Sequence, residues 1–377
     1  MSETAKTPKN RIVTLDLMKG IAIVGVVVLH LAVLQMHSGA MDDGSNFSFS
    51  VKAIPYSVFC TFIIISGYFH VRGRGFLENI KKRILRFLIY FVIAVFLLNS
   101  AMYLILLLQG YDLDPSSLWD VIWKTLVGKG AFSNLQDAAV YGGAILAPFE
   151  VTHALYFFQL LIVGFVIFYA VADRVLDDNR KLFAAIFILI TITVLYIQFV
   201  GILLPFYAHL GPLAAAFLLI GAYMKKIDFY GRLENAAKDK KYWLIFAASI
   251  IVLLTMCFLT PKDPSLLNCN VGPFGGFSFY TFVILTIAGC VAFSYIMSWF
   301  KDLRVMKGTF GKAGECTIEI FVFHMFVAKC LACPFVTFDT EVWFHLSFVQ
   351  GFILAIVTCA VIVVLKELYL RYIRTSG

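Results

Sequence analysis

Long apolar stretches separated by short polar segments recur along the whole chain. Each reaches about eighteen residues or more, the length typical of a transmembrane helix, because about 20 helical residues cross the hydrocarbon layer of a bilayer. None alternates between apolar and polar positions as the strands of a membrane barrel do. The pattern therefore predicts an all-α, polytopic membrane bundle of about ten transmembrane helices. We place these helices at 12–36, 53–70, 84–109, 153–172, 182–201, 203–224, 242–260, 278–300, 315–334 and 346–370.

Composition agrees with this pattern. Of the 377 residues, 61% are hydrophobic and 14% are charged, whereas about a quarter of the residues of a soluble globular chain are charged. No segment between the apolar stretches suggests a separate soluble domain. We therefore expect a single membrane-embedded domain over residues 1–377.

Basic residues alternate between the two sets of predicted loops. With the amino terminus in the cytoplasm, the inner segments carry 25 Lys and Arg residues, the outer segments carry five, and Lys19 lies within a helix. Positively charged loops stay on the cytoplasmic side, and no removable signal peptide is evident, so we expect both termini in the cytoplasm. The net charge of +8 then reflects topology. A nucleic-acid partner is not expected, since no folded basic domain presents a patch.

The longest predicted connection, 110–152, lies on the outer face and contains five acidic residues and two tryptophans. Structureless loops of that length are uncommon, so we expect short interfacial helices within it. These helices form either a lid over an outward-facing site or a solvated loop with aromatic anchors. The sequence leaves both interpretations open.

Most of the eight cysteines lie in apolar spans, where a thiol behaves as a small hydrophobe. Cys330 and Cys333 form a lone CxxC. Without a second pair or a histidine at a suitable spacing, this motif does not predict a metal site. Cys269 lies in an outer loop, so a disulfide with Cys333 is conceivable in an oxidising compartment.

The first predicted helix contains three ionisable residues, Asp16, Lys19 and His30. Such groups cost about 2.5–3.5 kcal/mol each inside a membrane, which makes them candidates for function. Lys19 and His30 fall within about 20° of each other on an ideal helix and roughly 16 Å apart along its axis. We expect Lys19 toward the cytoplasm and His30 toward the outer leaflet. This placement suits an anionic ligand at one end and proton transfer at the other.

Structural explanations exist for the same residues. Asp16 precedes Lys19 by three positions, so the two can form an ion pair near the helix end. Considered alone, His30 is as readily a packing residue. Glu315 and Glu319 are four residues apart on one predicted helical face, a placement that suits cation binding or proton relay.

The run RIVTLDLMKGIAIVGVVVLH, from Arg11 to His30, resembles the opening of the membrane-bound acyltransferase-3 family of bacterial O-acyltransferases. The first helix of that family carries Arg or Lys, then ten residues, then His, and Lys19 and His30 fit this pattern. Arginine is commoner at the first position. Lysine lacks the bidentate fork of arginine. The resemblance therefore supports a positive charge at position 19 more securely than it supports a phosphate-binding geometry there.

Two further segments resemble this family. FIIISGYF contains Ser66 and Gly67 and is similar to the family's Ser-Gly motif, where small residues permit close helix approach. KKRILRFLIYF contains Arg83 and Arg86 and resembles the family's paired arginines, without the usual proline after them. The resemblance implies that these arginines bind coenzyme A phosphates, for which arginine is suited. Topology alone also accounts for them.

Two later segments complete the resemblance. ALYFFQLL is similar to the family's Leu-Trp-Phe motif, with Tyr156 in place of Trp. Packing at the membrane interface explains this tyrosine equally well. IEIFVFHMF resembles the family's penultimate helix segment ending in His, which is His324 here. Glu319 is not expected in that segment.

The resemblance implies an O-acyltransferase of the bacterial inner membrane. Its acyl donor would be cytoplasmic acyl-coenzyme A, most simply acetyl-coenzyme A, as a co-substrate, with no permanently bound cofactor. Its acceptor would be a hydroxyl of a cell-envelope glycan, reached among membrane lipids. In this hypothesis, Lys19, Arg83 and Arg86 hold the donor and His30 deprotonates the acceptor, while Asp16, Tyr156, Glu319 and His324 bind substrate or support the site. Direct transfer and a covalent acyl-enzyme both remain open.

A transporter or flippase is the rival hypothesis. Lys19, His30, Glu319 and His324 would then form an ion or substrate pathway through the bundle. Transport of an intact glycan that does not depend on acyl-coenzyme A would favour it.

Overall fold

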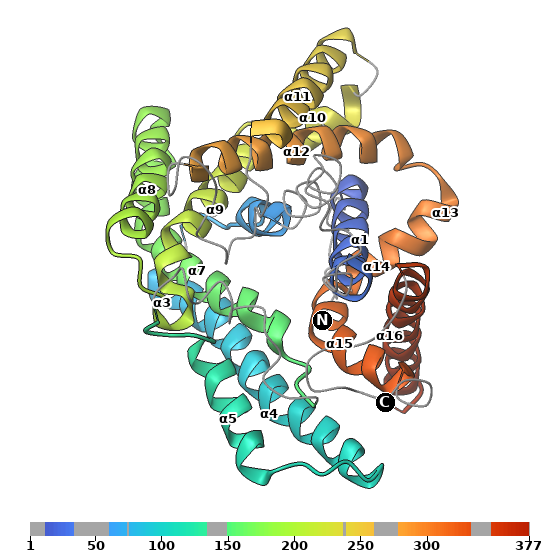
Figure 1. Ribbon diagram of the computed structural model, residues 1–377. Helices are drawn as coiled ribbons and strands as arrows, with labels where there is room; N and C mark the ends of the chain where they lie inside the picture. The colour runs from blue at the N-terminus through green and yellow to red at the C-terminus, as the bar shows by residue number, and fades with distance from the viewer. Residues whose placement is uncertain are drawn as a thin grey trace, which may run out of the picture.

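The computed structural model describes residues 12–33, 60–73, 75–133, 149–236, 239–259, 278–332 and 348–376. These residues form a bundle of helices (Figure 1). Seven helices among them are long and apolar enough to cross a membrane. The chain is therefore a multi-pass integral membrane protein, as predicted. The seven candidate spans are Val13–Leu31, Phe76–Leu108, Tyr156–Val175, Asn179–Phe199, Pro205–Lys226, Phe279–Phe300 and Val349–Ile373.

The other three predicted spans are also helical where the structure describes them. Residues 60–68 form the described part of the second predicted span. Helix α11 (Lys240–Leu259) matches 242–260, and α15 (Thr317–Ala332) matches 315–334. Helix α15 ends where the described residues end, so its 16 residues fall short of the length that a span needs.

Helix α1 (Val13–Val28) packs mainly against helices from the carboxyl-terminal part of the chain. Helices α14 (Lys312–Glu315), α15 and α16 (Phe348–Ser376) lie beside α1 on one side (Figure 1). Helix α4 (Leu85–Leu108) packs against α7 (Tyr156–Val175), which in turn packs against α9 (Gly211–Lys226). Helix α8 (Asn179–Phe199) covers α9, and α10 (Phe229–Ala236) also contacts α9. Helix α11 packs against α12 (Ser278–Phe300).

Glycines allow α1 to approach α14 and the π-helical turn Lys307–Gly311. A Cβ atom added at Gly20 would lie 1.8 Å from the carbonyl oxygen of Phe310, and one at Gly314 would lie 2.0 Å from the carbonyl oxygen of Asp16. Neither neighbour is a flexible side chain that can move aside. The backbones therefore touch here, which places the segment before α15 directly against α1.

A second pair of glycines joins residues 60–68 to α9. A Cβ atom at Gly67 would lie 2.0 Å from the Leu218 carbonyl oxygen, and one at Gly221 would lie 1.8 Å from the Ile64 carbonyl oxygen. This contact confirms that the small residue after Ser66 permits close helix approach.

The connection 110–152 contains α5 (Pro115–Val127), which confirms the short helix predicted there. Asp114 caps it, accepting a hydrogen bond of 3.0 Å from the Ser116 backbone N–H. Helix α5 turns back along α4 (Figure 1), and the Trp119 and Phe96 rings have centroids 6.5 Å apart. Residues 134–148 lie outside the described parts, so the lid stays a prediction.

Three buried charged residues connect this segment to α15. The Lys129 Nζ atom lies 2.5 Å from Oε1 of Glu150, and both side chains are at most 5% exposed. Lys329, near the end of α15, is 1% exposed and donates a hydrogen bond of 2.9 Å to the Glu150 backbone carbonyl. The sequence placed all three on the outer side but gave no sign of their contact. We call them the buried ion cluster.

Gly20→Ala is expected to force α1 away from Phe310 and to lower stability by about 1–3 kcal/mol, the usual cost of overpacking. Gly25→Ala is the matched control on the same helix, since no atom lies within 4 Å of a Cβ added there. Thermal unfolding in detergent can be followed with a thiol-reactive dye, because Cys60, Cys290 and Cys359 are buried free thiols. Equal melting temperatures for the two variants would contradict this packing.

Glu150→Gln is expected to destabilise the protein by about 3–5 kcal/mol, because it removes the carboxylate charge that faces a buried ammonium. Asp120→Asn in α5 is the control, since the Asp120–Lys124 pair is about half exposed and such pairs contribute roughly 0–1 kcal/mol. The same unfolding assay compares them. A loss for Glu150→Gln no larger than for Asp120→Asn would refute a stabilising role for the cluster.

Candidate active site

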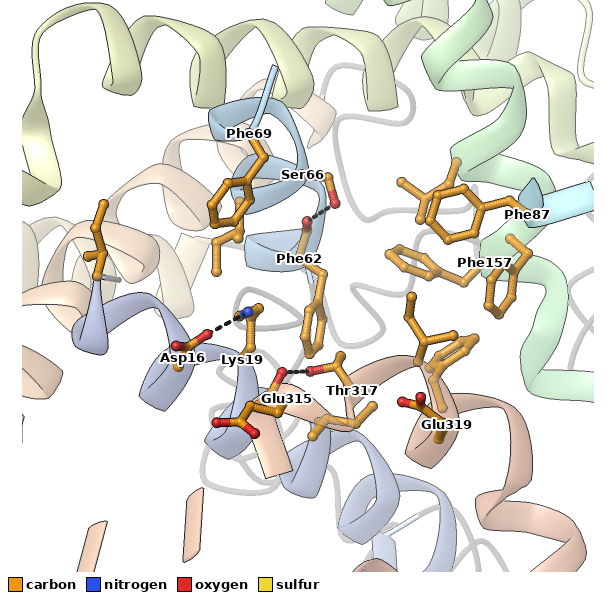
Figure 2. Close-up of a pocket in the computed structure, with 18 residues that line it drawn as sticks. Asp16, Lys19, Phe62, Ser66, Phe69, Phe87, Phe157, Glu315, Thr317 and Glu319 are labelled. Carbon is orange, nitrogen blue, oxygen red and sulfur yellow. Dashed lines mark hydrogen bonds and ion pairs between the residues drawn. The ribbon is translucent and has the colours of Figure 1, made fainter. Parts of the chain in front are cut away.

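A cavity of about 760 Å³ lies between α1, residues 60–69, the first turns of α4 and α7, and the α14–α15 junction. Its lining is mainly apolar, and its polar residues gather on the α1 and α14–α15 side (Figure 2). The six phenylalanines of the lining are Phe62, Phe69, Phe87, Phe157, Phe158 and Phe321. The structure thus brings to one cavity five residues singled out in the sequence: Asp16, Lys19, Ser66, Glu315 and Glu319.

Lys19 provides the positive charge of this cavity. Its Nζ atom lies 2.7 Å from Oδ1 of Asp16, so the ion pair predicted from their spacing is confirmed. The same Nζ lies 5.9 Å from the centroid of the Phe69 ring, within the range of a cation–π contact. Both charged side chains face the cavity (Figure 2). An ammonium held there by a carboxylate and a ring can attract an anionic group that enters.

The two acidic residues at the α14–α15 junction do not share one continuous helix, contrary to the prediction. Glu315 ends α14, Cys316 interrupts the helix, and α15 begins at Thr317. Both residues nevertheless line the cavity. The Lys366 Nζ of α16 lies 2.7 Å from Oε1 of Glu319 and donates to the Glu315 carbonyl at 2.9 Å. The Glu319–Lys366 ion pair therefore joins α16 to α15, which forms part of the cavity lining.

His30 and His324 form a hydrogen-bonded pair. The distance between His30 Nδ1 and His324 Nε2 is 3.0 Å. The rings are inclined by only 12° with centroids 5.1 Å apart, which fits an edge-to-edge hydrogen bond better than a face-to-face stack. His30 lies in a π-helical turn, Leu29–Val33, that continues α1. Such turns are frequent at functional sites. The sequence identified both histidines but not their contact.

The hydrogen bonds of His324 define where the protons lie on two neutral rings. Its Nδ1 atom is 3.1 Å from the carbonyl oxygen of Ile320 and 2.9 Å from that of Phe321. A carbonyl only accepts, so His324 carries its hydrogen on Nδ1 and its lone pair on Nε2. His30 must then donate from Nδ1. The lone pair of His30 is therefore on Nε2, the ring nitrogen that can take a proton.

The histidine pair lies beside one end of the cavity. Neither histidine lines the cavity, but Phe321 does, and its ring centroid is 6.1 Å from that of His324. On α1, Ile23 lines the cavity and precedes His30 by seven residues, about two helical turns. Helices α1 and α15 thus carry charged side chains, Lys19 and Glu319, that line the cavity, and they also hold the two histidines near its other end.

Arg83 lies at the cavity rim. Its Nη2 atom donates to the Phe69 carbonyl at 2.7 Å, and its Nη1 atom donates to the Ser66 carbonyl at 3.4 Å. These bonds satisfy carbonyls at the end of helix 60–68, a structural role that basic residues often play. Arg86 is exposed on the same helix and does not line the cavity.

Sequence reasoning missed Lys225 at this rim. Its Nζ atom donates to the His70 carbonyl at 2.5 Å, next to the carbonyl that Arg83 binds. The only signal was its place in a basic loop. Nearby, Arg72 lies 2.5 Å from Asp177, and this guanidinium lowers the pKa of the Asp177 carboxyl. Several cations thus lie on the side of the cavity opposite the histidine pair.

Tyr156, the first residue of α7, does not line the cavity. Its ring packs against that of Tyr207, with centroids 5.6 Å apart. The next two residues, Phe157 and Phe158, line the cavity instead. Cys269 and Cys333 lie outside the described residues, and so does the disulfide proposed for them.

Comparisons with known proteins identify the family of the chain. No curated protein and no solved structure matches the chain. A family model described as an acyltransferase domain matches residues 12–366, nearly the whole chain. This match covers both histidines, Lys19 and every segment that lines the cavity. The chain therefore belongs to the acyltransferase 3 family and is a membrane-bound acyltransferase.

Proposed function

We propose that this acyltransferase moves an acyl group, most simply acetyl, from cytoplasmic acyl-coenzyme A to a hydroxyl of a cell-envelope glycan. The observation that carries the proposal is the His30–His324 pair beside a cavity whose opposite side bears Lys19. The protein lies in the bacterial inner membrane with both termini in the cytoplasm, as its basic loops suggest. Residues 1–377 act as one domain.

Cations hold the donor at the cytoplasmic side of the cavity. Lys19 lines the cavity, while Arg83 and Lys225 lie at its rim on neighbouring carbonyls. Arg86 is exposed on the same helix as Arg83. Coenzyme A is a polyanion, and arginine and lysine both bind phosphate well. The apolar lining then receives the uncharged arm of the donor.

His30 acts as the general base. Its Nε2 atom takes the proton of the acceptor hydroxyl while the oxygen attacks the thioester carbonyl carbon. The carbon–sulfur bond then breaks, and the departing thiolate takes the proton from Nε2. His324 orients His30 and accepts from its Nδ1–H throughout, so that the lone pair stays on Nε2. The same nitrogen can instead attack the thioester first, which gives the covalent variant.

The proposal predicts that His30→Gln lowers acyl transfer by about 10²–10⁴-fold, the usual contribution of a general base. His209→Gln is the control, because His209 is a buried histidine that lies outside the cavity and accepts from the Leu204 backbone N–H. The measurement is incorporation of label from radiolabelled acetyl-coenzyme A into envelope glycans, in membranes with equal protein levels.

Full activity of His30→Gln would remove His30 from the mechanism. If the wild-type protein transfers no acyl group from any donor to any acceptor, yet moves intact glycan across the membrane, the transporter hypothesis replaces this proposal.

A further inference from the structure

An aromatic wall forms the end of the cavity nearest the histidine pair. We define it as Phe157, Phe158 and Phe321, which all line the cavity and are at most 6% exposed. The Phe321 ring centroid lies 5.5 Å from that of Phe157 and 5.4 Å from that of Phe158, at inclinations of 57°. Tilted aromatic contacts of this kind are stabilising and fix ring orientation. The wall is therefore a packed surface that resists displacement.

Within the wall, Phe321 both lines the cavity and contacts the histidine pair. Its ring faces the cavity and also lies 6.1 Å from the ring of His324. Its backbone carbonyl accepts the Nδ1–H of His324 at 2.9 Å. The two residues are three positions apart on α15, so one helical turn places both the Phe321 ring and the histidine. This end of the cavity therefore lies beside the histidine pair.

The neighbours of the wall leave little room for movement. Phe158 also packs against Phe87 of α4, with ring centroids 5.6 Å apart. Phe87 in turn contacts Phe165 of α7, at 6.2 Å. Interiors packed in this way respond even to one added methylene group.

We propose that Phe321, backed by Phe157 and Phe158, limits the length of the acyl group that the enzyme transfers. This inference rests on the proposed function, in which the donor arm enters the cavity and its thioester must meet His30. The methyl group of an acetyl donor ends at the wall. Each further methylene meets an aromatic ring beside the reacting carbonyl, so longer chains hold the thioester away from His30.

The test compares acetyl-, butyryl- and hexanoyl-coenzyme A as donors for the wild type, Phe321→Ala and Phe62→Ala. Phe62 lines the cavity but belongs to helix 60–68, away from the wall. Phe321→Ala is expected to raise the ratio of kcat/KM for hexanoyl over acetyl donors by about 10-fold or more, as a pocket discriminates by 10–200-fold per methylene. Phe62→Ala is expected to leave this ratio unchanged.

Phe321→Leu keeps the assay interpretable if the alanine variant unfolds, and it should shift the ratio in the same direction by a smaller amount. An unchanged ratio in both Phe321 variants, with acetyl transfer retained, would overturn the proposal. Efficient hexanoyl transfer by the wild type would overturn it as well. Absence of transfer from every donor by the wild type would instead overturn the proposed function, and this inference with it.

Discussion

The hydrogen bond between His30 and His324 is the constraint on which the site depends, because it requires α1 and α15 to hold two imidazole rings within 3.0 Å. Backbone contact at Gly20 and Gly314 brings α1 against the segment that leads into α15. The π-helical turn at Leu29–Val33 then sets the direction of His30. Larger residues at these glycines would separate the helices, and His30 would lose the partner that fixes its tautomer.

The two ends of the cavity differ in polarity: charged residues lie at one end and the histidine pair lies beside the other. Lys19 with Asp16 lines the cavity at one end of α1, and Glu319 with Lys366 joins its wall to α16. Between these ion pairs and the histidines the lining is mainly apolar and aromatic, and electrostatic interactions beside such a surface are stronger than in water. The buried ion cluster holds the far end of α15. An anionic donor with an uncharged arm fits this order of polar and apolar surfaces.

Much of this architecture could be predicted from the sequence, because membrane spans and ion pairs three residues apart are local patterns. The spans and the Asp16–Lys19 contact belong to this group. The His30–His324 bond joins residues 294 positions apart, and no local pattern encodes such a contact. The break at Cys316 and the buried ion cluster were missed for the same reason: tertiary packing, rather than helix periodicity or loop composition, decides them.

Nitrogen NMR of histidine-labelled protein in detergent at neutral pH tests the central claim most directly, since it reports which ring nitrogen carries the hydrogen. His→Gln variants at positions 30 and 324 would assign the two signals. The account predicts a hydrogen on Nδ1 and a lone pair on Nε2 for both rings, and a changed His30 signal when His324 is replaced. A hydrogen on Nε2 of His30, unaffected by the loss of His324, would contradict it.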